Sequence, residues 1–321
     1  MADPVAVPWA LSALFNHRAV ASEAATGTVF VFPSHGSRWT DMATDLMVSA
    51  PAFADEMRAC DAAFSGHTDR SLLADLQDGP EPPNRLDVSQ SLSFAVMVSL
   101  AAQWRQLGIH PDAVLGHSHG EIAAAYVAGG LTLQDAARVV SQRDNVIKAT
   151  ASGSGMVAIA WPVERVLALV ERWGQSIFVA AYNGPSSTVV TGTEAAIDEL
   201  LAALKRDDVP ADRIPVEFAL HSPQFDELHT VLRESLADLQ PRSTDVTFIS
   251  SVTGAGLDTS ILDGDYWYAN MRQPVLFEQA VQWAHWHGYH TFIEASPEPV
   301  LTAEIREALE VHGPRVHART Q

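Results

Sequence analysis

Hydrophobic and polar positions along the chain follow the pattern of a mixed α/β protein. Short apolar or β-branched runs at 28–32, 113–115, 246–252 and 291–294 predict buried strands. Between these runs, apolar residues recur every three or four positions over 41–64, 89–107, 132–148, 266–271 and 277–285, which predicts helices. Pro51 is expected to begin a separate helix within the first of these segments. We therefore expect a large domain of alternating strands and helices.

The pattern changes in the middle of the chain. Strands are predicted at 156–161, 177–182, 188–191 and 213–218, and helices at 163–173 and 195–205. The order β-α-β-β-α-β is that of a ferredoxin-like unit. Because strand–helix alternation resumes afterwards, we expect this unit to be inserted into the larger domain. The predicted organisation is a linker-like lead-in over 1–27, a large α/β subdomain over 28–150 and 217–321, and a ferredoxin-like subdomain over 151–216.

A serine between two glycines lies where a predicted strand passes into a predicted helix. The sequence Gly116-His117-Ser118-His119-Gly120 fits the pattern of a nucleophile elbow, in which the serine occupies a strained turn. A Cβ at either glycine would collide with the flanking backbone. The free N–H groups of the helix start would face a developing oxyanion. The alternative is an ordinary turn in which Ser118 caps the helix.

Composition and charge restrict the classes of function. The chain has 321 residues and a formal net charge of −19, which argues against general binding of nucleic acids or anionic membranes. The single cysteine, Cys60, excludes a disulfide framework, and no Cys/His spacing resembles a zinc site, so we expect no metal. Because the chain has neither a long apolar run nor a signal-peptide pattern, we expect a cytoplasmic protein.

A serine nucleophile needs a general base, and the chain has 13 histidines. His117 is adjacent to Ser118, but neighbouring side chains on such a turn diverge. His221 lies where the inserted unit rejoins the large subdomain, and clefts are common at such junctions. The three histidines between 285 and 290 fit a solvated helix face. From the residues alone, His221 is open to a structural and to a catalytic role.

An arginine lies in the middle of the predicted helix that follows the elbow. The apolar residues around Arg143 indicate a buried helix, and a buried guanidinium needs a partner. Asp144, the next residue, cannot share its face. Two interpretations stay open: a structural ion pair with a distant acid, or a bidentate clamp for the carboxylate of a substrate.

Six motifs, in order along the chain, resemble those of the acyltransferases of polyketide and fatty-acid synthases, which are related to malonyl-CoA:acyl carrier protein transacylases. The resemblance covers nearly the whole chain from Val29. The motifs are 29–39 (V-F-P-G-Q-G-S-Q-W in the family), 116–125 (G-H-S-x-G-E-x-A-A-A), 183–187 (N-G-P-S-S), 221–223 (H-S-P), 266–275 (Y-W-x-x-N-x-R-x-P-V) and 294–301 (E-V-S-P-x-P-V-L). The fourth motif selects His221 as the catalytic histidine.

The resemblance implies an α/β-hydrolase-like large subdomain that carries the ferredoxin-like one, with the active site between them. It implies a ping-pong mechanism with a Ser118–His221 dyad and no bound cofactor. The backbone N–H groups of His35 and His119 would form the oxyanion hole, and the backbone carbonyl of Asn270 would orient the histidine. The acyl group would pass from a CoA or carrier-protein thioester to the phosphopantetheine thiol of an acyl carrier protein.

The residues implied for the acyl pocket depart from the family. Arg143 falls at the position that binds the free carboxylate of malonyl-type substrates. Malonyl-selective members commonly read H-A-F-H and methylmalonyl-selective ones Y-A-S-H, whereas this chain reads F-A-L-H at 218–221. Leu220 would disfavour an α-branched acyl group, and Phe218 removes a polar group. His119, directly after the predicted nucleophile, replaces the small apolar residue or glutamine that is more usual in the family.

Two donors therefore stay open for a polyketide-biosynthesis acyltransferase. Arg143 favours a malonyl-type CoA thioester, which we expect. The unusual residues Phe218 and Leu220 favour an aminoacyl or dipeptidyl starter moved between two carrier proteins, as in macrolactam pathways. Because residues 4–27 resemble a shortened linker of modular synthases and the chain ends shortly after the last motif, we expect a discrete enzyme.

Two other classes of protein fit part of the sequence. A serine esterase or thioesterase would use Ser118 with a carboxylate-backed histidine, for which Asp263 or Asp265 and His290 are candidates. A non-enzymatic scaffold that binds carrier proteins would not need Ser118.

Overall fold

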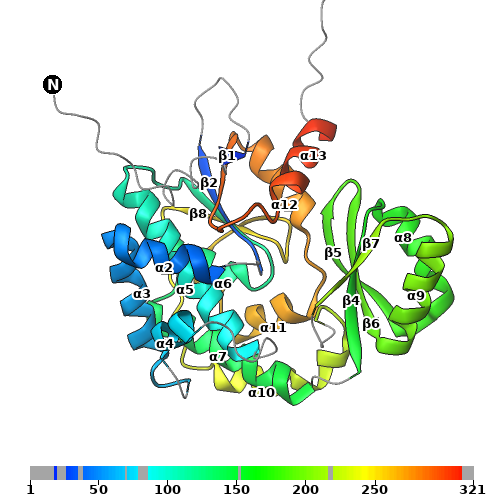
Figure 1. Ribbon diagram of the computed structural model, residues 1–321, viewed down its shortest axis with the longest axis horizontal. Coiled ribbons are helices and arrows are strands. Elements are labelled where there is room, and N and C mark those ends of the chain that lie inside the picture. The colour runs from blue at the N-terminus through cyan, green and yellow to red at the C-terminus, as the bar shows by residue number, and fades with distance from the viewer. Residues whose placement is uncertain are drawn as a thin grey trace, which may run out of the picture.

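Two β-sheets organise the chain in the computed structural model, each with its own helices (Figure 1). The structure describes residues 18–19, 27–34, 39–68, 71–78, 86–150, 153–215 and 220–312. No helix in these ranges is both long enough and apolar enough to span a bilayer.

The larger sheet has six strands in the order β1-β10-β2-β3-β8-β9. Its four central strands are parallel, and the short strands β1 and β9 pair antiparallel at the two edges. The strands are β1 (Arg18–Ala19), β2 (Thr28–Phe32), β3 (Ala113–Gly116), β8 (Thr247–Ser250), β9 (Ala255–Leu257) and β10 (Thr291–Glu294). In β2, Phe30 and Phe32 enter one hydrophobic core and Val29 and Val31 the other, so both faces of the sheet are covered.

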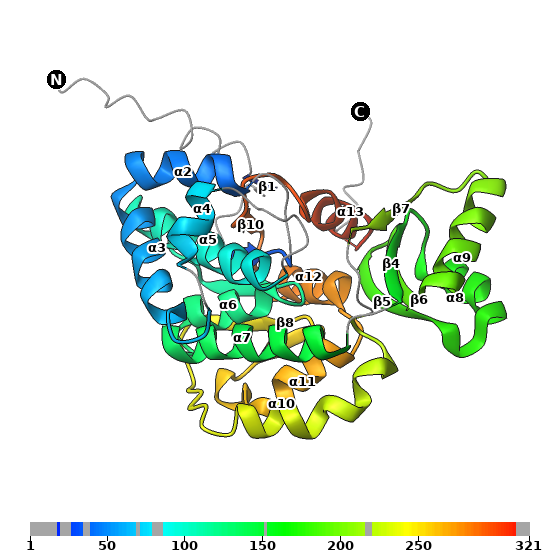
Figure 2. The same cartoon turned by 60° about the horizontal axis from the view of Figure 1, so that its bottom comes forward.

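Helices cover the two faces unequally. The core that contains Phe30 is built with α2 (Trp39–Ser49), α3 (Pro51–Phe64), α4 (Leu72–Asp78), α5 (Leu86–Gln106), α6 (Gly120–Ala128), α7 (Leu133–Thr150), α10 (His229–Ser235) and α11 (Gly264–Arg272). The opposite core is built with α12 (Phe277–Trp286) and α13 (Thr302–His312). Figure 2 shows these last two helices between the main body and the second sheet.

The second sheet has four antiparallel strands in the order β5-β6-β4-β7. Its elements are β4 (Ser154–Ile159), α8 (Val163–Val170), the 3₁₀ helix η1 (Glu171–Ser176), β5 (Ile177–Gly184), β6 (Ser187–Thr193), α9 (Glu194–Arg206) and β7 (Ala211–Ile214). This order is the ferredoxin-like one that the sequence predicts. Val157, Val190 and Leu200 contribute to a separate core between the sheet and its helices.

The two subdomains are joined by backbone pairing as well as by chain connections. Val275 lies beside β5, where it donates a hydrogen bond to the carbonyl oxygen of Ala180 (2.9 Å) and accepts one from the N–H of Tyr182 (2.8 Å). The segment that follows α11 in the large subdomain is therefore attached to the small sheet.

Most of the predicted elements occur, and the differences have local causes. Pro51 begins α3, as expected. The strand predicted at 213–218 is instead β7, Ala211–Ile214, and residues 216–219 lie outside the described ranges. The sequence analysis missed α4, β9 and α10, which are too short to show a clear period, and α13, whose apolar positions are few.

The turn from β3 to α6 leaves no space for side chains at its two glycines. A Cβ on Gly116 would lie 2.2 Å from the backbone of Glu121, and one on Gly120 would lie 1.9 Å from the carbonyl oxygen of Phe32. Between them, Ser118 has a φ of 51°, a left-handed conformation that residues other than glycine rarely adopt. This is the strand–turn–helix geometry of a nucleophile elbow.

We expect Gly120→Ala to lower the free energy of unfolding by about 3 kcal/mol or more, because backbone atoms cannot move aside as a flexible side chain can. Urea denaturation measures this change. Gly66→Ala is the matched control, since no atom lies within 4 Å of its added Cβ, and it should change stability by less than about 0.5 kcal/mol. Equal stability of the two variants would contradict the tight-turn geometry.

Candidate active site

A cavity of about 280 Å³ lies between the two subdomains. The small subdomain contributes mainly apolar side chains to its wall, including Met156, Val189 and Ile214. The large subdomain contributes the polar ones, among them Ser118, Arg143 and His221. The sequence analysis singled out these three polar residues, and the structure brings them together.

Ser118 and His221 form a hydrogen-bonded pair at the base of the cavity. The serine Oγ lies 2.9 Å from the histidine Nε2, and each residue is only 4% exposed. His221 also has a left-handed backbone, with a φ of 61°. Its Nδ1 lies 2.7 Å from the carbonyl oxygen of Gln273. Because a carbonyl only accepts, Nδ1 carries the hydrogen and Nε2 is free to accept the serine proton.

The expectation that the backbone carbonyl of Asn270 orients His221 is wrong in this geometry. The carbonyl of Gln273, three residues further on, occupies that place. The Asn270 side chain instead donates to the carbonyl oxygen of Ser118 (3.1 Å) and to Glu121 Oε2 (2.8 Å), and its Oδ1 accepts from Arg143 Nη1 (2.6 Å). Asn270 therefore links the elbow to the buried arginine.

Arg143 is a buried cation beside the nucleophile. Its Nη2 donates to Ser118 Oγ at 3.1 Å, and its Nε–H has no partner. The residue is 2% exposed, and within the described ranges no carboxylate lies at ion-pair distance from it. The structural ion pair considered from the sequence is therefore absent from this part of the chain. Burial lowers the pKa of Arg143 to about 10, but the group still carries its charge at neutral pH.

Glu121 supports the elbow from below. Its carboxylate accepts hydrogen bonds from Tyr266 Oη (2.8 Å), from Asn270, and from the backbone N–H and the hydroxyl of Ser251. The residue is completely buried, and burial raises its pKa despite these donors. This acid holds the start of α6, two residues after Ser118, against α11 and the end of β8.

The electrostatics of the pair favour a neutral histidine. Burial and the nearby positive charge of Arg143 lower the pKa of His221 to about 3, although the hydrogen bond to Gln273 acts in the opposite direction. At neutral pH the base is therefore unprotonated and ready to accept a proton.

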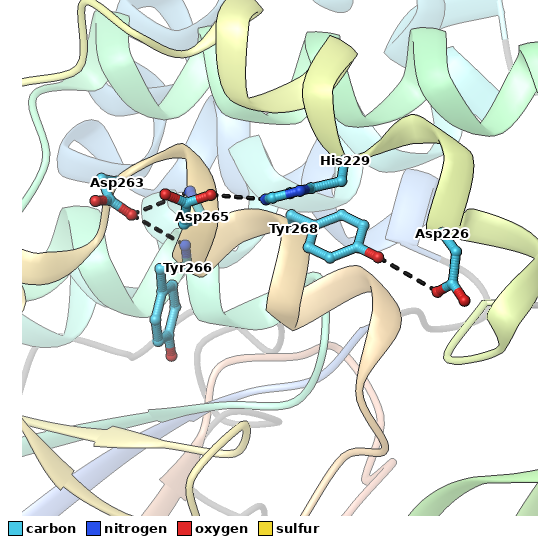
Figure 3. A network of polar contacts seen from close by, with 6 residues as sticks. All are labelled: Asp226, His229, Asp263, Asp265, Tyr266 and Tyr268. Carbon is cyan, nitrogen blue, oxygen red and sulfur yellow. Dashed lines mark hydrogen bonds and ion pairs between the residues drawn. The ribbon is translucent and has the colours of Figure 1, made fainter.

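A network of polar contacts on the outer side of α11 fixes this helix against the segment after His221 (Figure 3). Asp263 caps the helix by accepting from two backbone N–H groups. His229 lies 2.7 Å from Asp265, and Asp226 accepts from Tyr268 at 3.4 Å and forms an ion pair with Arg272. Asp226 and His229 follow shortly after His221 in the chain, so these contacts keep the base near the end of α11.

The residues of the esterase alternative are not brought together. Asp263 and Asp265 belong to the network of Figure 3, where Asp263 caps α11 and Asp265 contacts His229. His290 pairs with His285, with 3.1 Å between the two Nδ1 atoms. The partner of Ser118 is a histidine backed by a carbonyl, so a carboxylate-backed triad does not occur in the described part of the chain.

The other predicted site residues have mixed outcomes. His119 lies at the N-cap of α6, and its Nε2 lies 3.1 Å from the carbonyl oxygen of Gln90 on α5. Leu220 is buried and lines the cavity. His35 and Phe218 lie outside the described residues.

The sequence analysis missed Gln90, Ser93 and Asn183, which also line the cavity. Asn183 Oδ1 lies 2.8 Å from His117 Nε2 across the subdomain boundary. No sequence signal distinguishes Gln90 and Ser93, because the same helix carries other polar residues, such as Ser91 and Ser99.

Comparison with known proteins decides the family. The family model described as an acyl transferase domain matches residues 29–318. The chain belongs to the acyl transferase family. Members with solved structures combine an α/β-hydrolase-like large subdomain with a small ferredoxin-like one, as seen here.

Relatives from polyketide synthases support the same assignment. Mycoketide-CoA synthase of Mycobacterium tuberculosis is 48% identical over 286 residues, which is 88% of this chain and 7% of that synthase. The acyltransferase domain of module 8 of the salinomycin synthase is 43% identical with a TM-score of 0.85, over 90% of this chain and 69% of that one. A loading acyltransferase of the avermectin synthase is 42% identical with the same TM-score, over 89% and 92%.

We expect the charge of Arg143 to contribute to the pH dependence of serine acylation. Removing a nearby positive charge makes protonation of His221 easier, so its pKa should rise in Arg143→Gln, although burial still holds it below the ordinary value. The acid limb of kcat/KM for an uncharged acetyl thioester should then lie at higher pH in the variant than in the native protein.

Arg143→Lys is the matched control, because it keeps the positive charge and should keep the native profile. Identical profiles for the glutamine variant and the native protein would contradict the electrostatic effect of Arg143 on the base.

Proposed function

We propose that the protein moves a malonyl-type acyl group from a CoA thioester, through an ester on Ser118, to the phosphopantetheine thiol of an acyl carrier protein. The observation that carries this proposal is the position of Arg143. Its guanidinium lines the same cavity as Ser118 and has an N–H donor without a partner. Membership of the acyl transferase family supports the reaction type, and Arg143 supports selectivity for an acyl group with a free carboxylate.

The free carboxylate of a malonyl group complements Arg143 in charge and in geometry. A buried cation without an ion-pair partner costs free energy, and an incoming carboxylate reduces that cost. Guanidinium and carboxylate pair through two parallel hydrogen bonds. The 3.1 Å between Arg143 Nη2 and Ser118 Oγ suits a short acyl group, whose carboxylate binds the arginine while its thioester carbonyl reaches the serine.

In the first half of the reaction, Ser118 Oγ attacks the thioester carbonyl carbon while His221 Nε2 takes the hydroxyl proton. The C–O bond forms and the C–S bond breaks, and the proton passes from the histidine to the leaving thiolate. The backbone N–H groups of His119 and His35 would stabilise the oxyanion. In the second half, the carrier-protein thiol gives its proton to His221 and attacks the ester carbon. The C–S bond forms, the C–O bond to Ser118 breaks, and His221 returns the proton to Ser118 Oγ.

A second candidate donor is an aminoacyl or dipeptidyl group on another carrier protein. The observation that favours it is Glu304, a largely buried carboxylate that lines the cavity. Burial raises the pKa of this carboxyl group, and a protonated amine on the acyl group would stabilise its ionised form.

Incubation with malonyl-CoA should attach a malonyl group to Ser118, detected by intact-protein mass spectrometry. Ser118→Ala should remove all labelling. Arg143→Ala should lower kcat/KM for malonyl-CoA by roughly 100-fold or more, because a charged pair is lost, and should change the value for acetyl-CoA little.

Three results would contradict this proposal. Labelling by an aminoacyl carrier protein but not by malonyl-CoA would favour the second donor. Clearance of acyl-Ser118 by water as fast as by a carrier thiol would indicate a hydrolase. Retained carrier loading in Ser118→Ala would indicate a scaffold.

A further inference from the structure

Two polar side chains of α5 line the cavity without hydrogen-bond partners at their oxygens. They are Gln90, through Oε1, and Ser93, through Oγ. Each residue is 8% exposed. Buried polar atoms are almost always paired, since an unpaired one costs free energy. Other buried oxygens in the described part of α5, such as those of Ser91 and Ser99, also have no partner, but only those of Gln90 and Ser93 line the cavity, where a ligand can supply the missing hydrogen bonds.

His119 fixes α5 beside the nucleophile. Its ring nitrogen Nε2 donates to the backbone carbonyl of Gln90, 3.1 Å away, and its own backbone is next to Ser118. This bond ties the start of α5 to the elbow. The side chains of Gln90 and Ser93 therefore lie in the part of the cavity that the acyl group enters.

The chemistry of these oxygens restricts the ligand. Gln90 Oε1 only accepts hydrogen bonds, so it needs a donor. An ionised malonyl group has acceptors alone: its carboxylate can bind Arg143 but cannot satisfy Gln90. An acyl group that completes this site by itself carries an O–H or N–H.

The position of that donor follows from the short span of the site. If the thioester carbonyl lies at Ser118 and the carboxylate at Arg143, one carbon atom lies between them. A polar substituent can then be attached only at this α-carbon. A hydroxyl fits better than an amine, because a protonated amine would meet the positive charge of Arg143 in a buried, low-dielectric site.

We propose that Gln90 and Ser93 select a malonyl-type acyl group with a hydroxyl on its α-carbon. The hydroxyl donates to Gln90 Oε1 and accepts a hydrogen bond from the hydroxyl of Ser93. Leu220, which also lines the cavity, gives an apolar contact and disfavours a longer alkyl branch. This assignment rests on the proposed function and adds the identity of the α-substituent.

The test compares 2-hydroxymalonyl and methylmalonyl thioesters of pantetheine, which differ by a hydroxyl in place of a methyl group of similar size. Single-turnover acylation of Ser118 gives kcat/KM for each. We expect the native protein to prefer the hydroxymalonyl thioester by roughly tenfold or more, because a site built to bind a hydroxyl rejects the analogue that lacks it.

Ser93→Ala and Gln90→Leu should each reduce this ratio several-fold. Ser99→Ala is the matched control: Ser99 is on the same helix, and its buried Oγ also has no partner, but it does not line the cavity. The control should keep the native ratio. A ratio of two substrates on one preparation is not affected by the fraction of folded protein.

Equal acceptance of both thioesters, or a preference for methylmalonyl, would overturn the assignment, as would a ratio unchanged in both Ser93→Ala and Gln90→Leu. Malonyl loading that depends on Arg143 would, in those cases, leave the proposed function standing. Absence of any acyl group on Ser118 with every thioester tested would overturn both.

Discussion

The end of α11 and the residues after it touch each reactive part of the site. The amide of Asn270 binds the backbone of the nucleophile, the buried acid below it and the buried arginine. The carbonyl of Met271 accepts the N–H of the base, and the carbonyl of Gln273 accepts its ring hydrogen. Val275 then pairs with the small sheet. One short stretch of chain thus sets the positions of the nucleophile, the base and the subdomain boundary.

The side-chain amide of Asn270 lies between two buried ionisable groups. Asn270 donates to Glu121 and accepts from Arg143, so the acid and the guanidinium are connected without touching. A direct ion pair would neutralise the arginine and leave little reason for a carboxylate to enter. With the amide in between, Glu121 stabilises the charge of Arg143 without contacting it. The Nε–H group of Arg143 then stays available to a ligand.

Local features of the site could be predicted from the sequence, and long-range ones could not. The elbow was predictable because the turn has no space for a Cβ at positions 116 and 120, and the sequence has glycine at both. His221 was undecided from the residues, since it lies 103 positions from Ser118, and a family motif was needed to select it. Gln273 was missed because a backbone carbonyl has no residue signature. Asn270 does lie in the site, but it contributes its side-chain amide and not the backbone carbonyl that was expected.

The fold follows the same division. The hydrophobic pattern predicted the central strands and the long helices. A strand that is buried on both faces is a short continuous apolar run, whereas a helix that is buried on one face has apolar residues every three or four positions. It could not show that Gln90 and Ser93 lie at a cavity. A polar residue in an apolar helix has the same sequence pattern whether it meets a substrate or a neighbouring helix, and only the position of α5 beside His119 distinguishes the two.

The use of a main-chain carbonyl to hold the base has consequences for how this site can vary. Substitutions at position 273 that leave the backbone in place cannot remove the hydrogen bond to His221 Nδ1. The side chain at this position can therefore vary without loss of that contact. The carbonyl is also uncharged, and an imidazolium formed opposite it is stabilised less than one opposite a carboxylate. The protonated histidine therefore gives up its proton readily, which suits the proposed return of that proton to a departing thiolate.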